Sequence, residues 1–194
     1  MTADLLRAFV AVNLDIATVR HVADVARRLR SHPLARPASW VAPTKMHVTV
    51  RFLGDIDAAL VPALSDALAP LAKNHVVRPT HLGRADAFPS RTSARVLIAA
   101  IDDPFGDLAS LASAVEDRVC DLGLERERRT FVPHLTLARL RTPCDVSPWV
   151  HADALRSMDK AIFTELVLYR SDLAQSGAEY TALLRCPLQN QGAA

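Results

Sequence analysis

The chain has 194 residues, of which 50% are hydrophobic and 23% are charged, and its formal net charge is +2. This length and composition exclude a disordered or low-complexity chain and favour one domain, residues 1–194, with a sizeable core. The small charge does not by itself indicate a nucleic-acid partner. No apolar stretch approaches the ~20 residues of a membrane span, and the first residues lack the pattern of a signal peptide.

The three cysteines, Cys120, Cys144 and Cys186, are odd in number and lie far apart in the sequence. Such spacing is typical neither of a disulfide framework nor of a thiolate zinc site. The sequence therefore predicts a protein of the reducing cytoplasm.

Strand-like and helix-like segments alternate along the chain, judged by hydrophobic periodicity and capping residues. We expect a strand over 7–12, a helix after the N-cap Asp15, a strand over 46–53, a helix from about Asp57, and strands over 76–82 and 95–101. There follow a helix capped by Asp103, begun at Pro104 and stopped by Gly123, a strand over 134–140, a shorter helix over 149–157, and strands over 162–169 and 179–186. This order predicts one layered α/β or α+β fold.

A tetrapeptide repeat is the most informative feature of the sequence. His47-Val48-Thr49-Val50 is echoed 87 residues later by His134-Leu135-Thr136-Leu137, and each tetrad lies in a strand-like segment. Because side chains alternate along a strand, the histidine and the threonine of each tetrad share one face, and the apolar residues face the core.

Paired imidazoles and hydroxyls suit an in-line displacement at phosphorus. One imidazole takes a proton from the attacking oxygen and the other gives a proton to the departing oxygen, because an unperturbed pKa of ~6.5 allows either role near neutrality. The hydroxyls of Thr49 and Thr136 can donate hydrogen bonds to the non-bridging oxygens. The pattern contains no metal-ligand spacing, so we expect no metal.

Two arginines follow the tetrads. Arg51 shares the parity of His47 and Thr49, so we expect it to face the same side and to reach the phosphate. Arg139 has the opposite parity to His134 and reaches that side only if a β-bulge re-aims it.

Basic residues concentrate in two stretches, 25–54 and 73–95. Residues 25–54 contain six arginines or lysines and no acidic residue, which allows a basic surface for an anionic substrate but equally a set of solvated side chains. The cluster Arg126, Arg128 and Arg129 allows the same two readings. Trp40 and Phe131 are candidates for stacking on a base, although core packing is the commoner role of such aromatics.

Several longer segments resemble a known family: Trp40-Val41, MHVTVRFLG over 46–54, FVPHLTLAR over 131–139, and LYRS over 168–171 followed by Tyr180. With these segments the chain resembles the 2H phosphoesterases, and within them the RNA 2′,3′-cyclic phosphodiesterases of the LigT group. The resemblance implies a bilobal LigT-like α+β fold, in which two pseudo-symmetric lobes of antiparallel sheet carry helices outside and a cleft between them.

The resemblance also implies an activity. Family members hydrolyse RNA 2′,3′-cyclic phosphate ends to 2′-phosphomonoesters without a metal or cofactor, and some weakly join 2′-5′ RNA ends in reverse. By this resemblance His47 is the proton donor to the leaving 3′ oxygen, His134 is the base that activates water, and the two threonines hold the phosphate. Arg139 would be a phosphate or structural partner.

The expected partner is an RNA end carrying a cyclic phosphate, such as that of a tRNA fragment, and the expected state is a monomer. Two alternatives remain open at the level of sequence. One is a cyclic phosphodiesterase for small nucleotides, and the other is a non-catalytic module that binds RNA ends. Loss of either tetrad histidine would mark a binding-only protein, and both are present.

Overall fold

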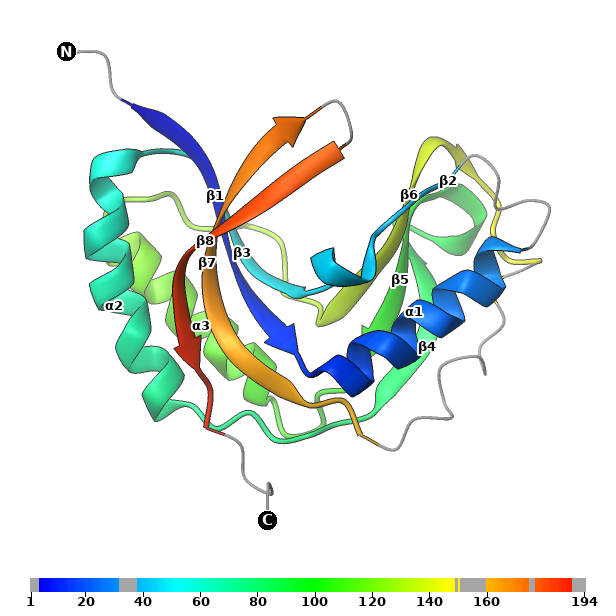
Figure 1. The fold of residues 1–194 in the computed structure, drawn as a ribbon, viewed down its shortest axis with the longest axis horizontal. Coiled ribbons are helices and arrows are strands. Elements are labelled where there is room, and N and C mark those ends of the chain that lie inside the picture. The colour runs from blue at the N-terminus through cyan, green and yellow to red at the C-terminus, as the bar shows by residue number, and fades with distance from the viewer. Residues whose placement is uncertain (1–3, 32–37, 149, 151–159, 175–176, 190–194) are drawn as a thin grey trace.

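The computed structural model describes residues 4–31, 38–148, 150, 160–174 and 177–189, and shows an α+β fold built on one antiparallel sheet (Figure 1). The strands run in the order β4-β5-β6-β3-β1-β7-β8, and β2 pairs with β6 beside this path. Their bounds are β1 Leu5–Leu14, β2 Ala38–Trp40, β3 Val48–Asp57, β4 Leu82–Phe88, β5 Ala94–Ile101, β6 His134–Cys144, β7 Phe163–Ala174 and β8 Gly177–Pro187. The expected α+β class is confirmed.

The sheet has two halves that meet at a narrow seam. β1, β3, β7 and β8 form one half through long ladders, and β2, β4, β5 and β6 form the other. Between β3 and β6, the strands that join the halves, the pairing consists of Val48 opposite Leu135. Both side chains are fully buried. Beyond this pair the two strands diverge, which gives the molecule its two-lobed shape (Figure 1).

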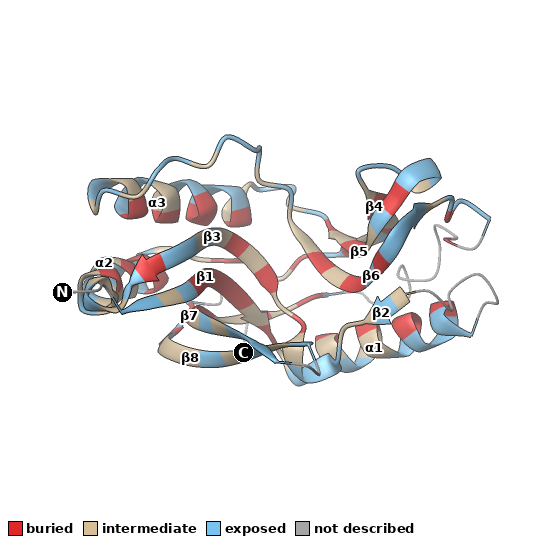
Figure 2. Cartoon of the chain, turned by 90° about the horizontal axis from the view of Figure 1, so that it is seen from above, coloured by how far each residue is buried: buried red, intermediate tan, exposed pale blue. Residues whose placement is uncertain are grey.

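Three helices cover the outside of the sheet. α1 (Ile16–Arg30) follows β1 but lies beside the half that contains β4, β5 and β6, whereas α3 (Asp107–Asp121) follows β5 but packs near β3 and α2 (Val61–Asn74) (Figures 1 and 2). The buried residues of each helix lie on one side, toward the sheet (Figure 2). In both cases, α1 and α3, the helix that follows a strand of one half of the sheet packs against the other half. None of the helices within the described ranges is long and apolar enough to cross a membrane.

Two of the predicted helix starts are confirmed, and the third is shifted. The Asp15 carboxylate accepts a hydrogen bond from the Thr18 amide at 2.9 Å, as an N-cap does, and Asp57 caps the 3₁₀ turn that leads into α2. The third helix begins at Asp107, not at Pro104, because the chain first makes a turn ending at Gly106, whose φ is +69°. Asp103 still accepts hydrogen bonds from the first-turn amides of Leu108 and Ala109.

Four of the seven predicted strands lie within observed ones. The strand over 162–169 matches β7 except that β7 starts at Phe163, and the strand over 46–53 matches β3 except that β3 starts at Val48. The prediction for 76–82 is wrong, because this stretch forms only the isolated bridges Val76–Gln189 and Thr80–Ala161, and Pro79 has no amide hydrogen to donate to a ladder. β4 begins instead at Leu82. The short helix predicted over 149–157 lies outside the described residues apart from position 150.

Candidate active site

The seam between the halves brings the two tetrads together. Val48 of the first tetrad pairs with Leu135 of the second, and in each tetrad the histidine and the threonine flank this apolar residue. Since neighbouring side chains in a strand point to opposite faces, all four polar side chains emerge on the face away from the buried pair. Opposed residues of an antiparallel pair lie about 4.5–5.5 Å apart at Cα, so the four groups share one small area.

A β-bulge changes the predicted faces along β3. Val10 of β1 pairs with Arg51 and Ala11 pairs with Thr49, so Val50 is an extra residue, and a second shift follows before Gly54. Phe52, expected in the core, is consequently 48% exposed and lies against Phe9, with 6.1 Å between ring centroids. In a regular strand Phe52 would share the buried face of Val48 and Val50, but the bulge reverses the alternation after Val50.

A second bulge, in β6, brings Arg139 to the face of the sheet that carries Thr136. Leu97 of β5 pairs with Ala138 while Ile98 pairs with Thr136, so Leu137 is extra, and both Leu137 and Ala138 are buried. The alternation therefore shifts by one residue, and Arg139 lines the same cavity as Thr136.

An aromatic cluster surrounds the first histidine. The imidazole of His47 stacks on Phe9 at 4.9 Å between centroids, meets Tyr180 edge-on at 5.4 Å, and lies 6.0 Å from Tyr169. The Asn13 amide donates a 2.8 Å hydrogen bond to the Tyr169 hydroxyl. These residues come from β1, β7 and β8, so the whole first half of the sheet helps to fix this ring.

Burial and neighbouring cations make His47 hard to protonate. Burial lowers the pKa of His47 to about 4, against an opposing hydrogen bond with the Lys45 backbone, and the charges of Arg139 and His134 lower it further. The imidazole of His134 is therefore close enough for its charge to act on His47. In the free protein at neutral pH, His47 is in its uncharged form.

The second histidine has a similar but milder environment. Its Nδ1 lies 2.6 Å from the Val132 carbonyl, and Phe88 meets the ring edge-on at 5.0 Å. Burial lowers the pKa of His134, and Arg139 adds to the effect. When the neutral ring carries its hydrogen on Nδ1 and donates it to the Val132 carbonyl, the Nε2 lone pair remains free to accept a proton.

A cavity of about 740 Å³ opens beside these groups. It is lined by Thr49, His134, Thr136 and Arg139 together with α3 residues such as Ser113 and Glu116. His47 is absent from the lining, because its ring packs into the aromatic cluster next to Thr49. The cavity is large enough for a nucleotide-sized ligand, and its lining combines the His134 imidazole with the two threonine hydroxyls and the Arg139 guanidinium, while His47 lies next to Thr49.

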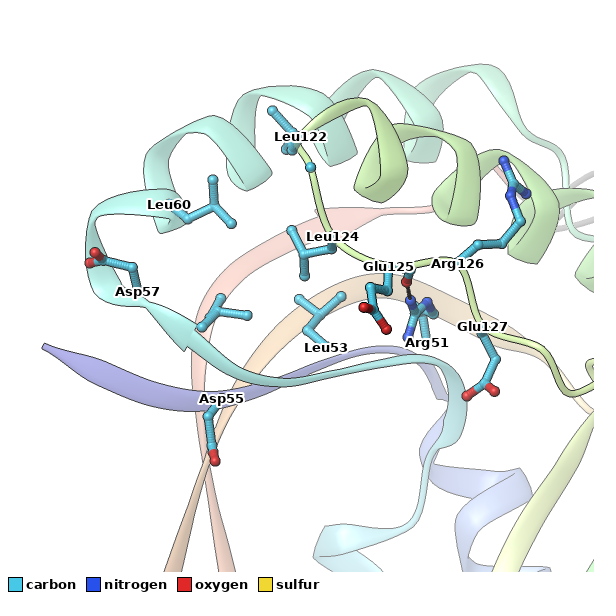
Figure 3. A pocket seen from close by; sticks show the side chains of 12 residues that line it. Arg51, Leu53, Asp55, Asp57, Leu60, Leu122, Leu124, Glu125, Arg126 and Glu127 are labelled. Carbon is cyan, nitrogen blue, oxygen red and sulfur yellow. Dashed lines mark hydrogen bonds between the residues drawn. The ribbon is translucent and has the colours of Figure 1, made fainter. Parts of the chain in front are cut away.

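Arg51 lines the 740 Å³ cavity, but its guanidinium is engaged by protein groups. Its Nε donates a 2.5 Å hydrogen bond to Glu116 of α3, and its other two nitrogens donate to the backbone carbonyls of Phe52 and Glu125. The bond to Glu125 is drawn in Figure 3, where Arg51 forms one end of a smaller cavity between β3, the start of α2 and residues 122–127. Only 10% of the Arg51 side chain is exposed, so this guanidinium holds α3 onto β3.

The other sequence candidates occupy structural positions. Trp40 and Phe131 pack against the core, and Phe131 also lines the 740 Å³ cavity. In the basic loop, Arg126 pairs with Asp117 and Arg129 pairs with Glu127, all at the surface. No group of three or more possible metal ligands occurs in the part of the chain that the structure describes.

Sequence reasoning missed the aromatic surroundings of His47. Phe9 reads as one more apolar residue of a buried strand, and its contact with a ring 38 positions later depends on the pairing of β1 with β3. Tyr169 and Tyr180 stood among the residues that carry the family resemblance. That resemblance was the only available signal for their position.

Known proteins of similar sequence and structure define the class of this fold. The family model "LigT like Phosphoesterase" matches residues 14–98. A solved structure from Thermus thermophilus, TT0787, superimposes with a TM-score of 0.80 at 25% identity and covers 96% of this chain and 100% of its own. The two-lobed antiparallel α+β architecture is therefore that of a phosphoesterase of the LigT type.

Curated relatives extend the match beyond the family model. The RNA 2′,3′-cyclic phosphodiesterase of Methanothermobacter thermautotrophicus is 25% identical over 91% of this chain and 95% of its own length. That of Geobacillus stearothermophilus is 29% identical over 77% of this chain, which spans only 48% of that longer relative. In sequence and in fold, the chain is thus similar to LigT-like phosphoesterases.

Proposed function

We propose that this protein hydrolyses 2′,3′-cyclic phosphates at RNA ends to 2′-phosphomonoesters, acting as a metal-independent monomer in the cytoplasm. The observation that carries the proposal is the pairing of Val48 with Leu135, which sets two His-x-Thr units on one face around one spot. The match of residues 14–98 to the LigT-like phosphoesterase model and the activity in the names of the curated relatives support the same reaction.

In this reaction a water molecule attacks phosphorus opposite the 3′ oxygen. His134 accepts the proton of the water on Nε2, the P–O3′ bond breaks, and His47 gives a proton to the departing 3′ oxygen. Thr49, Thr136 and Arg139 hold the non-bridging oxygens, where the negative charge increases. In a single-metal or two-metal hydrolase a cation would perform the roles that His134 and Arg139 have in this mechanism.

In this mechanism, His47 must become protonated when the substrate binds. The pKa of the free imidazole is about 4, so a donor role requires that the bound anion raise it. Sulfate is a suitable probe because its charge stays constant between pH 4 and 8. We expect saturating sulfate to raise the pKa of His47 by at least one unit in an NMR titration.

The same coupling predicts how sulfate binding depends on pH. Because the anion raises the pKa, the protonated form binds it better, so the affinity for sulfate should rise as the pH falls from 7 toward 4. The variant His47→Asn should lose much of this slope, while His134, whose pKa is also lowered, retains its own contribution. An unchanged His47 titration in saturating sulfate would contradict the donor role.

The reaction itself is tested with an oligoribonucleotide that ends in a 2′,3′-cyclic phosphate. We expect the product to carry its phosphate on the 2′ oxygen, as located by ³¹P NMR, and the rate to persist in excess chelator. A 3′-phosphate product, or inactivation by chelator, would contradict the proposal. An oligonucleotide bound at the site but not hydrolysed would indicate a binding module instead.

The same site can use a 5′-hydroxyl in place of water. When the 5′ oxygen attacks the cyclic phosphorus and the P–O3′ bond breaks, His134 takes the hydroxyl proton, His47 protonates the 3′ oxygen, and two RNA ends are joined weakly by a 2′-5′ linkage without a nucleotide cofactor. Such ligation, for example of tRNA fragments, is measurable with the same protein and a 5′-hydroxyl acceptor strand.

A further inference from the structure

Four arginines line the 740 Å³ cavity, and they differ in how their charge is compensated. Arg51 is paired with Glu116 at 2.5 Å and Arg129 with Glu127 at 2.8 Å. Arg95 and Arg139 form no ion pair with any residue that the structure describes. The cavity therefore presents two uncompensated positive charges to a ligand.

The two unpaired arginines lie in succession along the sheet. Arg139 is opposite Val96 in the β5–β6 ladder, and Arg95 is the residue just before Val96 on β5. His134 lies opposite Ala100, further along the same strand, so the order from the imidazole outward is His134, Arg139, Arg95. Arg139 acts on both imidazoles electrostatically, and Arg95 extends the positive charge away from them.

The wall of this outer part is apolar. Phe88 is opposite Val96 on the other side of β5, and Phe88, Pro89 and Val96 all line the cavity. The cavity thus offers an apolar surface flanked by two separate cations. An RNA strand has the matching chemistry, because its phosphates alternate with nucleosides that can lie against apolar or aromatic surfaces.

We propose that Arg95 binds the phosphodiester that precedes the terminal nucleotide, and so makes the site prefer an RNA strand to a 2′,3′-cyclic mononucleotide. This subsite rests on the proposed function, because it assumes that the cyclic phosphate lies between the two tetrads. The guanidinium forms charge-assisted and often bidentate hydrogen bonds to phosphate oxygens, and Arg95 is exposed and free to reach them.

The test compares two substrates on the variant Arg95→Gln. One is a dinucleotide that ends in a 2′,3′-cyclic phosphate and has one internal phosphodiester, and the other is a 2′,3′-cyclic mononucleotide without a 5′ phosphate. We expect the variant to raise KM for the dinucleotide about tenfold, the lower end of what a charged hydrogen bond contributes, with kcat retained. The mononucleotide should be hydrolysed with unchanged KM and kcat.

Salt dependence gives an independent measure of the same contact. For the dinucleotide, the slope of log(kcat/KM) against log[salt] should be shallower in Arg95→Gln by about 0.7, the contribution of one phosphate contact on a single strand. The control variant is Arg20→Gln, an exposed arginine of α1 that lines neither cavity, and it should match the wild type on both substrates.

The failure of this inference is distinguishable from the failure of the proposed function. If Arg95→Gln leaves both substrates unaffected, or weakens both equally, the subsite is wrong while the hydrolytic function stands. If the wild-type protein hydrolyses neither substrate, both the proposed function and the proposed subsite are wrong.

Discussion

Replacement of either tetrad histidine by alanine should reduce kcat by about 10²–10⁴-fold, the range that general acid–base catalysis contributes. The buried pair Val48 and Leu135 and the ladders around it are unchanged in both variants, so the fold should remain in place. Far-UV circular dichroism checks the fold, and hydrolysis of a cyclic-phosphate oligonucleotide measures the rate. The control is His81→Ala, because His81 is exposed and outside the site.

A modified substrate separates the two roles. When sulfur replaces the 3′ oxygen, the leaving group is a thiolate, whose conjugate acid has a pKa of ~8.5 and which departs without a proton donor. We expect His47→Ala to be nearly as active as the wild type on this substrate, and His134→Ala to remain inactive. The opposite pattern would exchange the assignments of acid and base. Full activity of both variants on the natural substrate would show that neither histidine takes part in catalysis.

Glu116→Ala should destabilise the protein by about 3–5 kcal/mol, because it leaves the positive charge of Arg51 buried without a partner. The Arg51 and Glu116 side chains are 10% and 13% exposed, and Glu116 also accepts hydrogen bonds from the Glu127 amide and the Cys120 thiol. Urea unfolding followed by circular dichroism measures the loss as a lower midpoint.

The neighbouring residue on the same helix provides the matched control. Asp117 pairs with Arg126 at 2.8 Å, but both side chains are about 60% exposed, so Asp117→Ala should barely shift the midpoint. The double variant Arg51→Met, Glu116→Leu should recover much of the stability, since it removes both charges from the buried position. Equal midpoints for Glu116→Ala and Asp117→Ala would contradict the structural role of this pair.

The sequence predicted the elements of the site better than their final orientation. The repeated tetrads, their position on strands and the shared face of histidine and threonine all follow from local alternation, which a pleated strand obeys. The N-cap at Asp15 is local in the same sense, because the carboxylate bonds an amide only three residues later.

The predictions fail where the orientation of a side chain depends on pairing with a strand that is distant in the sequence. The bulges at Val50 and Leu137 are defined by the registers of β3 with β1 and of β6 with β5, and nothing in the alternation of β3 or β6 indicates an extra residue. One bulge is associated with the pairing of Arg51 with Glu116 at the cavity wall, and the other with Arg139 lining the same cavity. The pairing of Arg51 with Glu116 also needs α3 to lie on β3, although α3 follows β5 in the chain.

The exchange of helices between the halves of the sheet bears on how the molecule assembles. Neither half is a contiguous stretch of the chain, because α1 is inserted between β1 and β3 while α3 is inserted between β5 and β6. A fragment that ends after either tetrad lacks strands or a helix that its own half requires. Synthesis must therefore be nearly complete before the His47 imidazole acquires its final neighbours, Tyr169 and Tyr180.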